Sequence, residues 1–382
     1  MLTTPLPARV LILSADMGEG HNAAARALTE VMEEIWPGVR VEQLDTVELR
    51  GSVFARLTRW LYEFQLRAFP WSYQLFYDVL CRSDAFARPL KTVTSWFFGQ
   101  QLERRLAGRR FDVIISTYPL GSGALDWLRR KRGLTTPTAT FIPAFHVHPW
   151  WAYAGIDLHF VMYADAARDA RTPGVETGMR VGAPMVRRGF GGLERADARR
   201  ALALGEDELV LLVTGGAWGL GGQADAVAAL VAIEPPVTTI VVCGRNEELR
   251  RDLEALDAPP KRLRVLGFVD DMPQLMAASD VVVTNGAGVT VLEALRSARP
   301  VIAFNPLAGH GRAATAVMVG LGLAIVCDGV DDLVRAVTDL VTDPALMARF
   351  AKAGEGFVEG KDLRRDLGIV QELFAARLGQ RV

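Results

Sequence analysis

Short apolar runs recur along the whole chain, and most of them are followed by loops of small or polar residues. In the first half these runs lie at residues 9–15, 39–44, 112–116, 138–142 and 157–162. In the second half they lie at residues 209–214, 240–242, 264–266, 281–284 and 301–304. Their lengths and bounding loops predict buried parallel strands, with helices between them. The alternation predicts an α/β fold of two doubly wound Rossmann-like domains that face a cleft.

Residues 280–312 give the clearest single unit of this pattern. A buried strand runs into the loop Asn285-Gly286-Ala287-Gly288, a helix follows over about 289–297, and a second strand leads to the loop 307–312. Small residues let backbone N–H groups approach a phosphate, and the start of the helix adds a favourable dipole. Thr290 and Glu293 are three apart and share one helix face, where Glu293 can accept hydrogen bonds from two ribose hydroxyls. The pattern predicts a nucleotide site.

A Gly- and Arg-rich segment at 182–192 marks the expected domain boundary. We therefore predict an N-terminal domain over 1–185 and a C-terminal, nucleotide-binding domain over 186–360. A final helix over 361–382 carries an apolar stripe, formed by Leu363, Leu367, Val370, Phe374 and Leu378. This stripe must be buried, and we expect the helix to pack back across the two domains.

The segment from about 53 to 107 interrupts the first domain and differs in character. Between Phe54 and Phe98 lie 7 Phe, 3 Trp and 3 Tyr, and basic residues outnumber acidic ones by 6 to 3. Apolar residues recur at helical spacing, which predicts an amphipathic helical insertion. Aromatic and basic faces suit a lipid–water interface, preferably an anionic one. The alternative is a helical insertion that packs as ordinary core.

Bulk composition narrows the class of protein. The chain has 382 residues, a net charge of −1 and 23% charged residues, so it favours a folded protein without an attraction for nucleic acid. Three widely separated cysteines fit free thiols in a reducing compartment. The first strand begins too early for a signal peptide, and no apolar run reaches transmembrane length. We expect a cytoplasmic protein that can still lie on a membrane.

The loop after the first predicted strand holds the candidate catalytic residue. It reads Asp16-Met17-Gly18-Glu19-Gly20-His21, and a helix begins at about Asn22. The positive end of the helix dipole favours a neutral His21, which is what a general base requires. The alternative is a histidine at a helix start without a chemical role. A later His146-Val147-His148 sequence, with His159 beyond it, suggests zinc, but no Cys or carboxylate completes the set.

These motifs, in their order and spacing, resemble the monogalactosyldiacylglycerol synthases and processive diacylglycerol glucosyltransferases, relatives of the lipid II N-acetylglucosaminyltransferase. The resemblance rests on LILSADMGEGHNAAA, IISTYP, and His148 with Trp151 in the first half. In the second half it rests on VVCGRN, LGFVDDMPQLMAASD and TNGAGVTVLEAL. It implies the two-domain glycosyltransferase B (GT-B) fold. It also implies inverting, metal-independent transfer of a hexose from a UDP-sugar to diacylglycerol or a related lipid.

The resemblance also implies a role for individual residues. His21 matches the catalytic base, and no cofactor is expected, since the UDP-sugar is a substrate. The implied acceptor-binding residues are Gly18, Gly20, His148 and Trp151. The implied donor-binding residues are Gly216, Ala217, Arg245, Phe268, Gly286, Ala287, Gly288, Thr290, Glu293, Gly309, His310 and Arg312. The implied membrane-facing residues are Trp60, Trp71, Trp96, Phe97 and Phe98. The expected location is peripheral, on the inner face of the cell membrane.

The sequence departs from the family pattern in three places. Pro143-Ala144 stand where the family has a Thr-Asp pair, and Gly286-Ala287-Gly288 replaces a Pro-Gly-Gly loop. Gly309-His310-Gly311-Arg312 and Ala314 stand where a carboxylate and an amide read the donor sugar. The identity of the sugar is therefore open. The remaining alternatives are a transferase with another acceptor and a sugar-nucleotide-binding protein with altered or lost transfer.

Overall fold

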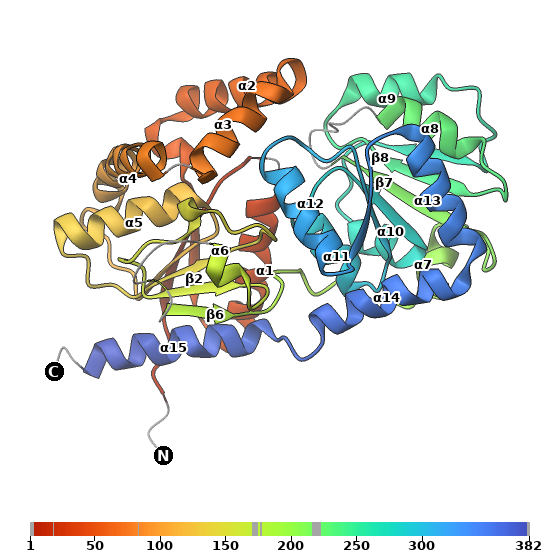
Figure 1. Ribbon diagram of the computed structural model, residues 1–382. Helices are drawn as coiled ribbons and strands as arrows, with labels where there is room; N and C mark the ends of the chain where they lie inside the picture. Colours follow the sequence, from red (N-terminus) through yellow and green to blue (C-terminus); the bar gives the residue numbers. More distant parts are fainter. Residues whose placement is uncertain are drawn as a thin grey trace. The chain divides into compact units, whose positions relative to one another are not determined.

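The computed structural model describes residues 4–17, 19–82, 84–169, 175, 178–215 and 223–379, and every structural statement below concerns these residues. The chain divides into two compact units. Unit 1 comprises Met1–Met185 and Gly360–Val382, and unit 2 comprises Val186–Glu359. Each unit is an open α/β layer structure built on a parallel sheet (Figure 1).

The sheet of unit 1 has six parallel strands in the order β2-β1-β3-β4-β5-β6. The strands are β1 (Arg9–Ser14), β2 (Arg40–Asp45), β3 (Val113–Ser116), β4 (Thr138–Phe141), β5 (Leu158–Val161) and β6 (Met179–Val181). The strand β1 is apolar and buried, as expected for a sheet covered on both faces. The chain leaves β1 for one edge and returns through β3 on the other side, so strand order reverses between β1 and β3.

Helices connect and cover these strands. They are α1 (Gly20–Ile35), η1 (Val47–Arg50), α5 (Pro119–Arg132), η2 (Pro149–Trp151) and α6 (Ala166–Asp169). Pro119 stands at the start of α5 and Gly133, with φ of 66°, ends it. Proline is tolerated in a first turn and a left-handed glycine closes a last one, so local sequence sets both ends.

The insertion consists of three helices, α2 (Ser52–Ala68), α3 (Pro70–Arg82) and α4 (Asp84–Leu106), drawn in orange in Figure 1. Of the 21 large apolar side chains exposed among the described residues, 13 lie between Val53 and Trp96. We call these 13 the aromatic surface. They are Val53, Leu57, Trp60, Leu61, Phe64, Phe69, Trp71, Leu75, Phe76, Val79, Phe86, Val93 and Trp96.

The prediction for Phe98 was wrong. Its side chain is 5% exposed and packs into the core of unit 1 with Leu102 and Trp127, because it lies on the face of α4 that covers α5. Phe97 is partly buried, where it contacts Phe54 and lies under the Arg50 guanidinium. Both therefore hold the insertion to its unit, whereas Trp60, Trp71 and Trp96 are exposed.

The last helix, α15 (Leu363–Gly379), belongs to unit 1 and packs on α1. Leu363, Leu367, Val370 and Phe374 of its stripe are buried. Gln371 accepts a hydrogen bond from the Trp36 indole at 3.1 Å, and Arg364 pairs with Glu34 at 2.8 Å. The contacts of the stripe are thus made with the first domain.

Unit 2 has a second six-stranded parallel sheet, in the order β12-β11-β10-β7-β8-β9. Its strands are β7 (Val210–Thr214), β8 (Thr238–Val242), β9 (Leu263–Leu266), β10 (Val281–Thr284), β11 (Val301–Phe304) and β12 (Ala324–Cys327). Its helices are α7 (Arg195–Ala201), α8 (Gln223–Val231), α9 (Glu247–Glu254), α10 (Met272–Ala278), α11 (Val289–Arg296), α12 (His310–Gly320), α13 (Val330–Thr342) and α14 (Pro344–Val358). Strand order reverses between β7 and β10. The structure therefore consists of two doubly wound Rossmann-like units, which confirms the predicted fold class.

No helix in the described part of the chain combines the length and the apolar character needed to cross a bilayer.

Candidate active site

In unit 1 the reversal of strand order brings two loops together at the carboxyl ends of β1 and β3. Such a reversal opens a crevice where ligands of open α/β sheets bind. The loop after β1 leads to His21 in the first turn of α1, and the loop after β3 contains Thr117 and Tyr118. The predicted catalytic residue therefore lies at the point where this fold most readily holds a substrate.

His21 is fixed by two hydrogen bonds to the loop after β3. Its Nδ1 atom lies 2.7 Å from the Thr117 carbonyl oxygen, and the Thr117 hydroxyl donates to the His21 carbonyl at 3.1 Å. A carbonyl oxygen can only accept, so Nδ1 carries the hydrogen. In the neutral ring Nε2 then carries the lone pair. This tautomer is the one that a general base acting through Nε2 requires.

Aromatic rings surround this imidazole. The Tyr118 ring meets it edge-on, with centroids 4.9 Å apart, and the Trp151 ring lies 5.9 Å away. The ring centroids of His148 and Trp151 lie 6.1 Å apart, so Trp151 stands next to both His21 and His148. Trp151 is 2% exposed and packs beside the imidazole. Gly20 precedes His21, and a Cβ built there meets nothing within 4 Å, so open space adjoins it. Gly18 lies outside the described residues.

The loop that carries His148 and Trp151 is held by the helical insertion. The Lys91 ammonium on α4 donates to the Pro149 carbonyl at 2.7 Å and to the Ala152 carbonyl at 2.6 Å. On α3, the Tyr77 hydroxyl lies 2.7 Å from His146 Nδ1. These contacts were not predicted from the sequence, because nothing in the local pattern relates residue 91 to residue 149.

The zinc motif considered for His146, His148 and His159 is not assembled as a ligand set. His159 is buried in β5, and its Nε2 accepts a hydrogen bond from the Tyr153 amide at 3.2 Å. Burial lowers the pKa of His159 to about 4, so this ring is neutral. Over the described residues, no group of three or more His, Cys, Asp or Glu side chains could hold a metal ion.

In unit 2 the reversal between β7 and β10 places the loop 285–288 at the crevice. Added Cβ atoms show space around this loop: at Gly288 nothing lies within 4 Å, and at Gly286 only the Thr284 hydroxyl does, at 3.6 Å. The helix α11 begins at Val289, so its first N–H groups adjoin that space. Thr290 and Glu293 follow on one face, and Glu293 is 7% exposed. Open space beside a loop of small residues, next to the N–H groups of a first helical turn, is typical of an anion-binding site.

The other predicted donor residues lie at neighbouring strand ends. Arg245 follows β8 and Phe268 follows β9, and the Arg245 guanidinium lies 5.2 Å from the centre of the Phe268 ring. Phe268 is 52% exposed, so part of its ring is open to solvent. Gly216 and Ala217 lie outside the described residues.

The loop after β11 joins the loop after β10. The Leu307 amide donates to the Asn285 carbonyl at 3.3 Å, so the two loops lie against each other. Gly309 has φ of 70° and precedes α12, which places His310 and Arg312 in the first helical turn. Both side chains are exposed.

Two family models match the chain, one for each unit. Residues 21–179 match the model described as monogalactosyldiacylglycerol (MGDG) synthase, and residues 194–357 match the model described as glycosyl transferases group 1. The protein is a GT-B glycosyltransferase related to the diacylglycerol glycosyltransferases. The first match begins at His21, and the second covers the loops of unit 2 where the donor residues were predicted.

Curated relatives and solved structures agree. A processive diacylglycerol beta-glucosyltransferase from Bacillus licheniformis is 25% identical over 345 residues, covering 87% of each chain. A protein of the same name from Bacillus cereus is 27% identical over 314 residues, covering 79% of this transferase and 77% of the relative. Structurally, MurG from Acinetobacter baumannii superposes with a TM-score of 0.61 at 18% identity, covering 96% of this chain and 100% of MurG. The calicheamicin glycosyltransferase CalG4 gives 0.62 at 16% identity, covering 97% and 99%.

Proposed function

We propose that this transferase moves a hexose from a UDP-sugar to the hydroxyl of diacylglycerol, or of a related lipid, with inversion at the anomeric carbon and without a metal ion. The observation that carries the proposal is the position of His21. It lies at the strand reversal of unit 1, with Nδ1 held by the Thr117 carbonyl at 2.7 Å. The names of the curated relatives support the acceptor, and the loops of unit 2 support a nucleotide-linked donor.

In this mechanism Nε2 of neutral His21 accepts the proton of the acceptor hydroxyl as its oxygen attacks the anomeric carbon. The bond from that carbon to the diphosphate oxygen breaks on the opposite face, and UDP leaves. The imidazolium that forms keeps its Nδ1–H on the Thr117 carbonyl, which stabilises the positive charge. General base catalysis of this kind contributes about 10²–10⁴-fold.

The donor would lie along the strand ends of unit 2. The first N–H groups of α11 suit the diphosphate, Glu293 suits the ribose hydroxyls, and the Phe268 face suits the uracil. Together with Gly216 and Ala217, these assignments follow from the family resemblance. His310 and Arg312 would face the sugar or a phosphate.

The aromatic surface supports peripheral attachment to a membrane, on its cytoplasmic side. Exposed apolar patches on monomers rarely exceed a few hundred Å², and larger ones mark interaction sites. Thirteen exposed large apolar side chains on adjoining helices, including Trp60 at 58% and Trp71 at 67% exposure, exceed what solubility favours. Basic residues on the same helices favour anionic lipids.

One experiment tests the activity. The protein is incubated with UDP-glucose, UDP-galactose or UDP-N-acetylglucosamine and with diacylglycerol vesicles, and both UDP and glycolipid are measured. We expect one donor to give both products, and His21→Ala to lower turnover by about 10²–10⁴. Release of UDP without a lipid product would indicate another acceptor. Tight donor binding without UDP release would favour the second candidate, a binding protein that has lost transfer, which the departures at 309–314 permit.

A further inference from the structure

The helix α2 has two faces that do different things. Its outer face carries Trp60, Leu61 and Phe64, all exposed. Its inner face carries Ala55, Arg59 and Leu66, at spacings of four and seven residues, which lie on one side of a helix. Ala55 is fully buried against Ala15 and Val47, in a small cluster that also includes Met17 and Tyr118. The helix that exposes the tryptophan therefore also packs on the loop that leads to His21.

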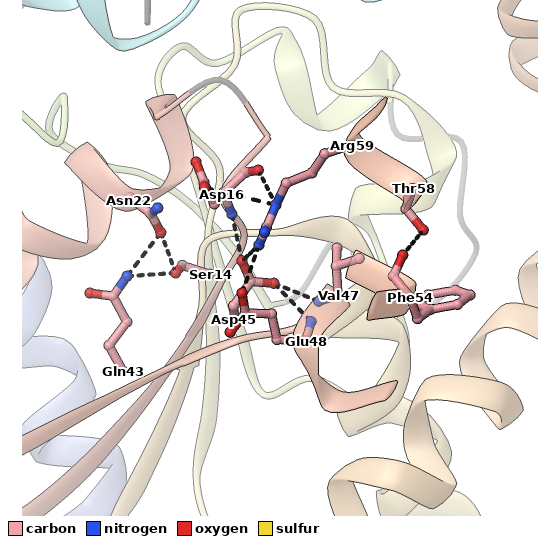
Figure 2. Close-up of polar contacts among 10 residues, drawn as sticks. All are labelled: Ser14, Asp16, Asn22, Gln43, Asp45, Val47, Glu48, Phe54, Thr58 and Arg59. Atoms are coloured by element: carbon pink, nitrogen blue, oxygen red, sulfur yellow. Dashed lines mark hydrogen bonds and ion pairs between the residues drawn. The ribbon is translucent and has the colours of Figure 1, made fainter. Parts of the chain in front are cut away.

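Arg59 makes the polar part of this contact (Figure 2). Its Nε donates to the Asp16 carbonyl at 2.9 Å, and its Nη2 donates to Asp45 at 2.7 Å and to Glu48 at 3.2 Å. Its side chain is 19% exposed, so water screens these contacts only partly. Burial lowers the pKa of Arg59, but the neighbouring carboxylates more than offset this and raise it.

Asp45 completes the bridge. One of its oxygens accepts from the Asp16 amide at 2.9 Å, and the other accepts from the amides of Val47 and Glu48 at 2.7 and 3.1 Å. Asp16 is thus held at both ends of its backbone, at N–H by Asp45 and at C=O by Arg59. Asp16 lies five residues before His21, at the point where the chain leaves β1.

The first turn of α1 has its own attachment to the sheet. The Asn22 side chain accepts hydrogen bonds from Ser14 at 2.7 Å and from Gln43 at 2.9 Å. Figure 2 shows this group on one side of β1 and the Arg59 group on the other. The strand side of the His21 loop is therefore held independently of α2, and Arg59 provides a polar link between the loop and the insertion.

We propose that Arg59 is a positioning residue that couples docking of α2 on a lipid surface to the geometry of the His21 loop. Docking buries the outer face of α2 and fixes the helix, and Arg59 transmits this to Asp16. This proposal rests on the proposed function for its membrane and its reaction. Without Arg59, the loop keeps its β-sheet contacts and its apolar contact with Ala55 but loses this polar link to α2.

The test compares Arg59→Gln with Arg56→Gln, a matched control. Arg56 is exposed on the same helix, so both variants remove one positive charge from α2, but only Arg59→Gln removes the contact with Asp16. We expect equal vesicle binding in sedimentation, but a kcat on diacylglycerol vesicles at least about tenfold lower for Arg59→Gln, with an unchanged KM for the UDP-sugar. Arg59→Lys keeps the positive charge but lacks the planar guanidinium that donates to several acceptors at once. This variant should therefore recover turnover only in part. Equal kcat for the two glutamine variants, full activity of Arg59→Lys, or selective loss of vesicle binding by Arg59→Gln would each overturn the proposal.

Hydrogen exchange separates this proposal from the reaction itself. In the wild type and in Arg56→Gln, vesicles should slow exchange at the amides of Asp16 and of residues 19–22, and Arg59→Gln should lose this protection. The same protection in all three proteins, or none in the wild type, would overturn the coupling. If no donor gives UDP release with the wild type, the proposed transfer fails, and the exchange result still decides the coupling.

Discussion

Replacing the two most exposed tryptophans should release this transferase from membranes. Trp60 and Trp71 are 58% and 67% exposed. A fully accessible tryptophan exposes on the order of 250 Å², so together the two present roughly 300 Å². If docking buries half of this area, at about 25 cal/mol per Å², the pair contributes about 4 kcal/mol to binding. If docking buries only about a quarter of this area, the contribution to binding falls to about 2 kcal/mol.

We therefore expect Trp60→Ser with Trp71→Ser to weaken vesicle binding about 30- to 700-fold. The assay is sedimentation with phosphatidylcholine vesicles, with and without phosphatidylglycerol. Val319→Ser with Leu321→Ser is the matched control, since both side chains are exposed in unit 2 and lie outside the aromatic surface. The double tryptophan variant should keep its thermal unfolding midpoint, because exposed side chains contribute little to stability. Unchanged binding of that variant would refute the membrane role of the surface.

Three further predictions concern the donor site and stability. Gly288→Ala should change the free energy of unfolding by no more than about 1 kcal/mol, because the added Cβ meets nothing in the protein. The same variant should raise the KM for the donor about 5- to 100-fold if a diphosphate fills that space. An unchanged KM would place the diphosphate elsewhere. Phe268→Ala should weaken UDP binding by about 1–3 kcal/mol in calorimetry through lost stacking, while Val326→Ala, an exposed residue of the same unit, should not; equal affinities would remove Phe268 from the base site. Burial raises the pKa of the Asp366 carboxyl to about 6 from 3.8, so between these values the folded state holds a proton that the unfolded state has lost, and wild-type stability falls as pH rises. Asp366→Asn cannot titrate, so its free energy of unfolding does not fall in this way. In urea unfolding, it should rise relative to that of the wild type by about 2–3 kcal/mol between pH 4 and pH 7. A difference between the two proteins that does not depend on pH would contradict the raised pKa of Asp366.

The strands could be predicted because their signal is local. Each long apolar run with a small-residue loop after it became a parallel strand, and β10 and β11 lie where the sequence indicated. Two strands, β6 and β12, were missed. In β12, Ala324–Cys327, only two of the four side chains are buried. In β6, Met179–Val181 is short, and two of its three side chains are exposed. A run that lacks apolar periodicity carries no strand signal.

The site was predicted only as far as residue type and order allow. Trp151 contacts both His21 and His148, but the partner that fixes the His21 tautomer is a backbone carbonyl, which no sequence pattern marks. Asp45 lies at the end of a predicted strand, but its contacts with Arg59 and with three backbone amides carry no sequence signal. Phe98 and Trp60 are both aromatic residues of the insertion. Only the packing of α4 on α5 determines that one is core and the other surface.

Burial distinguishes Glu293 from the exposed residues 310 and 312, where this transferase departs from the family pattern. Glu293, at the proposed nucleotide end, is 7% exposed, so replacing it would disturb the packing of α11. His310 and Arg312 are exposed in the first turn of α12, where a change of side chain costs the fold little. Selection for a different donor sugar can therefore alter residues 310 and 312 while the nucleotide end is retained. We propose that the departure reflects a changed sugar preference, in which case the assay with three donors should show selectivity for one sugar while UDP itself binds normally.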